Sequence, residues 1–154
     1  MLIIQRSTME IRQVEQKEIE GVLNLIDEYD RPRSPRPSYD DMRTIHKAIL
    51  ETGGCVVGAF STGSMVGTCT INICANLSWS GRPYAIIENV IVSKSHRNQG
   101  IGKAILEYAT DFAQQAGCYK AALMTGSKEP ATHRLYESAG FSASKQGYQI
   151  RFNA

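Results

Sequence analysis

Hydrophobic residues recur at spacings of three and four over residues 101–116, and this period predicts a helix with one apolar face. Residues 85–92, just before it, form an apolar run that only Glu88 and Asn89 interrupt. A run of this kind is typical of a central strand covered on both faces. The pattern therefore predicts a buried strand, a polar turn and a long amphipathic helix as the centre of the fold.

The same patterns predict the other elements. Strands are expected at 10–14, 54–60, 65–75, 119–124 and 148–152, and helices at 15–29, 38–50 and within 131–139. In the last strand, Tyr148, Ile150 and Phe152 alternate with polar residues, as in a half-buried antiparallel strand. This order predicts an α/β fold with a mixed, mostly antiparallel sheet of six or seven strands, helices on both faces, and a single domain over residues 1–154.

Composition bears on several classes of function. The chain has 17 basic and 15 acidic residues, and this balance argues against a nucleic-acid-binding protein. The sequence contains no run of 18 apolar residues, so it predicts no membrane-spanning helix. The four cysteines lack metal-ligand spacing, so we expect no bound metal, reduced and mostly buried thiols, and a cytoplasmic location. They are Cys55, Cys69, Cys74 and Cys118.

The glycine-containing turn between the central strand and the long helix suggests a phosphate site. Such a turn presents free backbone N–H groups at the positive end of the helix dipole. Two common phosphate loops do not match. One needs a hydroxyl residue after its lysine, where Ala104 follows Lys103, and the other needs a third glycine, where the chain has Ile105.

The segment Arg97-Asn98-Gln99-Gly100-Ile101-Gly102 resembles the Gln/Arg-x-x-Gly-x-Gly/Ala turn that binds pyrophosphate in the GNAT acetyltransferases. The context is also similar to that family: an apolar strand, a long helix, a further strand, and a short helix followed by Gly140-Phe141. The close resemblance covers residues 85–141. It implies splayed central strands, acetyl-CoA as cosubstrate and a homodimer.

The resemblance also implies which residues bind acetyl-CoA. Backbone groups of the central strand would pair with the pantetheine arm, one N–H would face the thioester oxygen, and the turn would bind the pyrophosphate. Lys103 could instead pair with Glu107, one helical turn later. The predicted cofactor-binding residues are Val90, Ile91, Val92, Arg97, Asn98, Gln99, Gly100, Ile101, Gly102 and Lys103.

Two ionisable side chains are candidates for proton transfer. Glu88 lies inside the apolar strand, where burial would raise its pKa toward the range useful to a general base. Alternatively, an arginine such as Arg82 neutralises it. Tyr136 occupies a helix position where the family often has a tyrosine near the cofactor sulfur, which implies a general acid. The alternative is a tyrosine that only packs under the sheet.

Three further residues are candidates for acceptor binding. The strand Ile87-Glu88-Asn89-Val90 is similar to Ile-Glu-Asp-Ile of glucosamine-6-phosphate N-acetyltransferases, with Asn89 in place of the aspartate. The run from His133 to Tyr136 is similar to a motif of aminoalkylphosphonate acetyltransferases. Trp79 could line the pocket or cover the sheet edge.

The connection 31–37 holds three prolines and three arginines. In the family, the two helices that it joins form one wall of the acceptor site. We therefore expect a mobile loop whose arginines either meet an anionic acceptor or cofactor phosphate, or remain solvated.

Together these features predict an acetyl-CoA-dependent N-acetyltransferase that acts on a primary amine of a small molecule by direct attack in a ternary complex. A protein N-terminus or lysine is the alternative acceptor. A CoA-binding sensor without catalysis would keep the fold but would not need both Glu88 and Tyr136. A phosphoryl-transfer enzyme would need a metal-ligand pair and a Lys-Ser/Thr ending, which the sequence does not provide.

Overall fold

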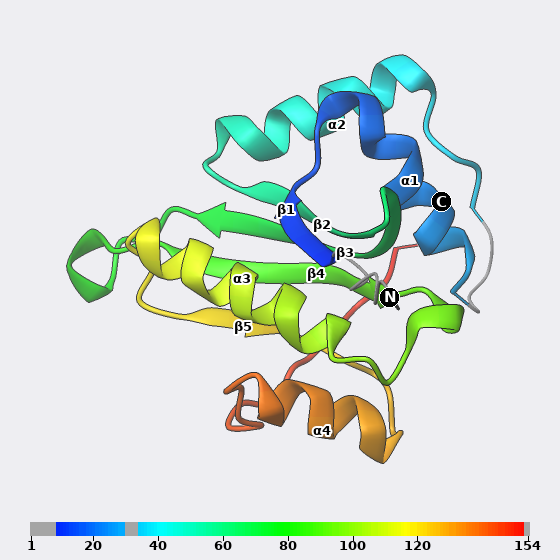
Figure 1. The fold of residues 1–154 in the computed structure, drawn as a ribbon. Helices are drawn as coiled ribbons and strands as arrows, with labels where there is room; N and C mark the ends of the chain where they lie inside the picture. Colours follow the sequence, from blue (N-terminus) through cyan, green and yellow to red (C-terminus); the bar gives the residue numbers. More distant parts are fainter. Residues whose placement is uncertain (1–8, 30–33, 153–154) are drawn as a thin grey trace, which may run out of the picture.

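The structure, a computed structural model, describes residues 9–29 and 34–152, which form a five-stranded mixed sheet flanked by helices (Figure 1). The strands lie side by side in chain order. The first four are antiparallel to one another, and the fifth runs parallel to the fourth. They are β1 (Met9–Gln13), β2 (Cys55–Ser61), β3 (Ser64–Cys74), β4 (Tyr84–Val92) and β5 (Ala121–Leu123).

The helices of the described residues are α1 (Ile19–Asp27), α2 (Tyr39–Glu51), α3 (Ile101–Gln115) and α4 (Pro130–Ser138), with short 3-10 turns η1 (Gln16–Glu18), η2 (Trp79–Gly81) and η3 (Lys94–His96). Sequence signals mark the start of α2 and the end of α3 among them. At the start of α2, the hydroxyl of Ser38 accepts a hydrogen bond from the N–H of Asp41 at 3.1 Å. After α3, Gly117 takes a φ of 82°, a conformation that terminates a helix. None of the described helices is long and apolar enough to cross a membrane.

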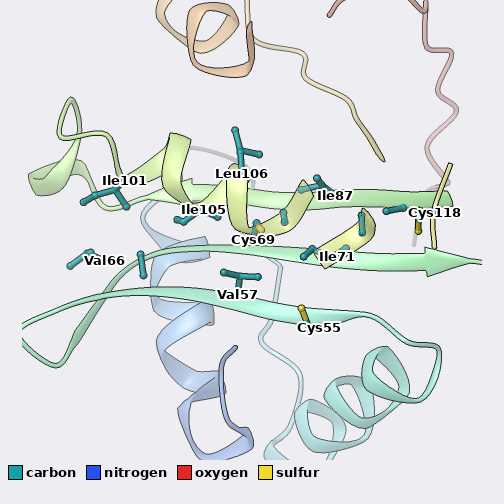
Figure 2. Close-up of a cluster of buried hydrophobic side chains, with 14 residues drawn as sticks. Cys55, Val57, Val66, Cys69, Ile71, Ile87, Ile101, Ile105, Leu106 and Cys118 are labelled. Carbon is teal, nitrogen blue, oxygen red and sulfur yellow. The ribbon is translucent and has the colours of Figure 1, made fainter. Parts of the chain in front are cut away.

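Helices cover both faces of the sheet, as predicted. Val56 and Val57 are neighbours in β2, so their side chains point to opposite faces. Val57 belongs to the larger core, beneath Ile101 and Ile105 of α3 (Figure 2). Val56 belongs to a second core with Val22 of α1, on the face that α2 also covers. The sheet is therefore a shared wall between α3 on one side and the α1–α2 pair on the other.

The cysteines lie mostly in these cores. Cys55, Cys69 and Cys118 are buried, Cys74 is half-buried, and all four are free thiols. Burial raises the pKa of Cys55 and of Cys69 to about 12, so these two stay protonated at neutral pH.

The prediction of six or seven strands is wrong, because the described residues form five. Residues 148–152, expected to be a strand, form neither helix nor strand. Their apolar side chains are exposed, with Tyr148 at 88%, Ile150 at 77% and Phe152 at 87%. Alternating apolar and polar residues suit the two faces of a sheet. A strand also needs a neighbouring strand to which its backbone can hydrogen-bond, and residues 148–152 have none among the described residues.

The middle of β4 contains a β-bulge that the sequence did not indicate. Thr70 lies opposite Glu88 and Thr68 lies opposite Ile91, so β3 advances two residues while β4 advances three. The irregularity includes Asn89, whose φ of 55° is left-handed. Asparagine adopts that conformation more readily than most residues. The bulge bends β4 next to the point where it ceases to pair with β5.

β4 and β5 are paired over three residues only. The last pair joins Ile87 to Leu123, and beyond it residues 88–92 have no strand partner on the β5 side in the described part of the chain. An open slot in the sheet therefore begins where the bulge begins. Pairing stops at the last residue of β5, so the expected splaying of two strands stays a prediction.

Candidate active site

A cleft of about 1540 Å³ lies where the pairing of β4 with β5 ends. Its wall includes the bulged part of β4, the end of β5 and the cleft-facing side of α4. Residues 88–91 of β4 line it together with Tyr29, His133 and Tyr136. Its size suits an extended ligand, and its strand wall offers backbone groups without a strand partner.

The turn before α3 has the geometry of an anion site. Gly100 takes a φ of 78°, and a β-carbon built there would meet no atom within 4 Å. Asn98 is also left-handed, with a φ of 61°. The first amides of a helix have no intrahelical acceptor, and here the N–H of Ala104 donates to the Gly100 carbonyl at 3.1 Å. The amides before Ala104 are therefore suited to bind a phosphate at the positive end of α3.

Two basic side chains of the turn, Arg97 and Lys103, are exposed. Lys103 Nζ lies 3.8 Å from Glu107 Oε1, so the alternative role predicted for this lysine is realised in the structure. Both partners are about half exposed, and a surface pair of this kind contributes little to stability. The pair can therefore open at small cost when an anion binds nearby.

Gly102 connects the turn to α4. A β-carbon at this position would lie 3.1 Å from Leu135 Cδ2 and 3.2 Å from its Cδ1. Glycine thus allows the first turn of α3 to pack directly against the residue that precedes Tyr136. This contact sets the position of Tyr136 relative to the anion site.

Tyr136 is half-buried in the cleft wall. Burial raises the pKa of its phenol, the nearby Tyr29 adds to the rise, and a hydrogen bond with Thr125 opposes it. The phenol is therefore protonated at neutral pH and has a proton to give. His133, one helical turn earlier, lines the same cleft, with Nε2 2.8 Å from the carbonyl oxygen of Ser127.

Glu88 is exposed, so the expectation that the apolar strand buries its side chain is wrong. The alternative, a pair with Arg82, does not occur either. Arg82 donates instead to the carbonyls of Gly117 and Cys118, at 3.3 and 3.0 Å. A role for Glu88 in proton transfer must therefore rest on where its carboxylate lies.

That place is the junction of two cavities. A second cavity, of about 470 Å³, lies between the α1–α2 pair and the sheet. We call it the helix groove, defined by its lining residues Val22, Leu23, Ile26, Met42, Ile45 and Ile49 together with His46, Glu88 and Asn89. Glu88 and Asn89 line both cavities. The arrangement can hold two ligands whose ends meet at this pair.

Sequence reasoning missed His46. It is 5% exposed, lines the helix groove, and its Nε2 has no hydrogen-bond partner in the described part of the chain. Its spacing gave the signal, because Met42, His46 and Ile49 follow one another at four and three residues on one helical face.

Trp79 and Arg36 lie against other residues rather than in either cavity. The Trp79 ring stacks on Tyr119 with centroids 5.0 Å apart, and Trp79 lines neither cavity, which favours the covering role. Arg36 binds Asp27 at 2.6 Å and Asn24 at 2.8 Å. The other two arginines of that connection, Arg31 and Arg33, lie outside the described residues.

The model of the acetyltransferase (GNAT) family matches residues 19–141, which is most of the chain. This chain belongs to the GNAT family. Two curated relatives are 32% identical to it. One is a glucosamine 6-phosphate N-acetyltransferase of Trypanosoma brucei brucei, matched over 58% of this chain and 58% of its own length. The other is N-acetyltransferase family 8 member 2 of Rattus norvegicus, matched over 66% of this chain and 44% of its own length. The match thus spans about half the length of these two relatives.

Solved structures of GNAT proteins have the same fold. A protein of Agrobacterium tumefaciens, provisionally named an acetyltransferase, superposes with a TM-score of 0.82 at 35% identity, over 93% of this chain and 99% of its own. An aminoglycoside N-acetyltransferase solved with CoA superposes with a TM-score of 0.78 at 19% identity, over 99% of this chain and all of its own. The second likeness is one of fold alone.

The proteins of this family are acetyltransferases, and the aminoglycoside N-acetyltransferase that shares the fold was solved with CoA. Within residues 9–29 and 34–152, no cluster of three or more histidine, cysteine, aspartate or glutamate side chains could hold a metal ion.

The buried imidazole of His46 predicts a dependence of stability on pH. Burial lowers the pKa of His46 from its ordinary value of 6.5. The unfolded chain then gains a proton near pH 6.5 that the folded chain gains only at lower pH. We expect the melting temperature to fall as the pH is lowered from 7.5 to 5.5. In the variant His46→Gln, the part of this fall that His46 causes should be absent. His133→Gln, an exposed site, is the control. Equal slopes for His46→Gln and the parent would contradict the assignment.

Proposed function

We propose that this GNAT chain transfers the acetyl group of acetyl-CoA to a primary amine of a small molecule by direct attack in a ternary complex. The observation that carries the proposal is the meeting of two separate cavities at Glu88 and Asn89. A direct transfer needs both reactants bound at once, with the reacting atoms held together. One cavity for each reactant and a shared junction satisfy this need.

The cleft wall of β4 and the turn that follows this strand would together hold acetyl-CoA. The backbone of Val90, Ile91 and Val92, unpaired toward β5, would hold the pantetheine arm. The turn from Arg97 to Lys103 would bind the pyrophosphate through its amides and two basic side chains. When bound, acetyl-CoA supplies the acetyl group as an activated thioester.

Two side chains carry the protons of the reaction. Acetyl transfer forms a carbon–nitrogen bond and breaks a carbon–sulfur bond, so the nitrogen loses a proton and the sulfur gains one. The Glu88 carboxylate, at the junction, accepts the proton of the amine directly or through one water. The Tyr136 hydroxyl, in the wall of the cleft, donates a proton to the leaving sulfur. Asn89 and His133 line the same cleft and can orient the reacting groups.

We also propose a cytoplasmic location and a homodimer. The four free thiols support a reducing compartment. A homodimer would cover an exposed apolar surface near the end of the chain. That surface consists of Tyr148, Ile150 and Phe152, three large apolar side chains exposed within five residues.

Binding of CoA should raise the melting temperature, because a ligand at one hundred times its dissociation constant stabilises the folded state by about 2.7 kcal/mol. Gly100→Val should abolish this shift, because a β-branched residue resists the left-handed conformation of the turn. Gly63→Val is the matched control. Gly63 has a φ of 85° and equally open surroundings, but it lies in the β2–β3 hairpin. A shift retained in Gly100→Val, or absent from the parent, would contradict CoA binding at this turn.

Tyr136→Phe removes one oxygen and should leave folding and CoA binding intact. If the phenol protonates the leaving sulfur, kcat should fall about 100-fold, with little change in KM for acetyl-CoA. Steady-state release of free thiol measures both constants. Tyr108→Phe is the control, a half-buried tyrosine of α3 that does not line the cleft. Full activity in Tyr136→Phe would remove this role.

The homodimer can be measured by sedimentation equilibrium. We expect the parent at micromolar concentration to sediment at twice the chain mass, and Ile150→Lys to shift it to monomer, because a buried charge opposes association. Leu77→Lys, at a fully exposed residue elsewhere, should remain dimeric. A monomeric parent would show that the proposal is wrong.

A further inference from the structure

The helix groove has apolar walls supplied by two helices. Val22, Leu23 and Ile26 of α1 face it from one side, and Met42, Ile45 and Ile49 of α2 from the other. Its volume of about 470 Å³ lies within the range of about 300 to 1,000 Å³ that is usual for small-molecule sites. Covering these helix walls with the apolar surface of a ligand is favourable, whereas the polar side chains Thr70 and Asn72 of β3 lie on the sheet side of the groove.

The described lining of the groove offers no positive charge to an anionic ligand. No lysine or arginine occurs among the described residues that line it. A phosphate group bound there would lose water without gaining the charged hydrogen bonds that proteins use to hold phosphate. Arg36, the nearest basic residue in sequence to the wall residue Pro37, is already paired with Asp27 and Asn24.

Two polar residues of the groove are shared with the cleft. They are Glu88 and Asn89, and the carboxylate of Glu88 attracts an ammonium group. His46 is buried in the α2 wall, and burial lowers its pKa, so its ring is neutral at physiological pH. The wall therefore adds no positive charge that would repel an amine.

We infer that the acceptor is a primary amine on an uncharged apolar body, aliphatic or aromatic, that lies in the helix groove with its nitrogen toward Glu88. This inference rests on the proposed function and narrows its substrate. It separates this chain from its curated relative that is named for glucosamine 6-phosphate. That acceptor carries a phosphate, for which the described lining of the groove has no cation.

The first test compares acceptors with the full chain. Release of free thiol from acetyl-CoA gives kcat/KM for 2-phenylethylamine, 3-methylbutylamine, glucosamine 6-phosphate, spermidine and a short peptide with a free N-terminus. We expect the two apolar amines to exceed the other three by about 10-fold or more, since each apolar group that fills a pocket changes specificity by such factors. A preference for the sugar phosphate, the polyamine or the peptide would overturn the inference and leave the proposed acetyl transfer intact.

A second test places a charge in the groove. Ile45 of α2 is 51% exposed and lines the groove, so Ile45→Lys should fold and should lower kcat/KM for 2-phenylethylamine about 10-fold, mainly through KM. Leu50→Lys is the matched control, because Leu50 is 44% exposed on the same helix and does not line the groove. Both variants should keep the full thermal shift with CoA. Equal losses in the two variants, or no loss in Ile45→Lys, would overturn the inference.

A binding measurement separates this inference from the proposed function. In the presence of CoA, 2-phenylethylamine should raise the melting temperature of the parent and of Leu50→Lys, and should do so less for Ile45→Lys. If no amine releases thiol but this pattern holds, acetyl transfer fails and the groove assignment stands. If 2-phenylethylamine produces no shift in the parent, the groove assignment fails, whatever the result with CoA.

Discussion

The hydrogen bonds between β4 and β5 stop at the pair of Ile87 and Leu123, and the site is built around this interruption. A strand in the middle of a sheet normally satisfies its backbone groups on both sides. Beyond Ile87 the β5 side of β4 has no strand partner among the described residues, so those groups are free to pair with a ligand. The cleft, the exposed strand wall and the turn that follows all depend on that one change of pairing.

The bulge beside the interruption explains why two adjacent residues serve one site. In a regular strand Glu88 and Asn89 would point to opposite faces of the sheet. The extra residue and the left-handed Asn89 break the alternation, and both residues line both cavities. A carboxylate and an amide thus lie where an acceptor and a thioester can meet. The fixed positions of α3 and α4, joined through Gly102 and Leu135, bring Tyr136 into the same cleft.

Features set by short spacings along the chain could be predicted from the sequence. The period of α3, the apolar run of β4 and the glycine turn between them are local, and all three were correct. Features that depend on distant partners were not predictable in the same way. Residues 148–152 alternate as a strand does, but the sequence cannot show which neighbour would pair with them. Glu88 lies in an apolar run yet is exposed, in the part of β4 that extends beyond the end of β5. His46 enters the site through the packing of α2 over the sheet.

Residue-resolved amide hydrogen exchange with and without CoA tests the central claim most directly, because it reads the backbone groups themselves. The account predicts slower exchange with CoA at the amides of residues 90–92 that lack a strand partner, and at those of residues 98–103 in the turn and first turn of α3. It predicts little change at β1 and β2, whose ladder is already formed. Protection confined to the helix groove, or no protection in the slot and the turn, would contradict the account.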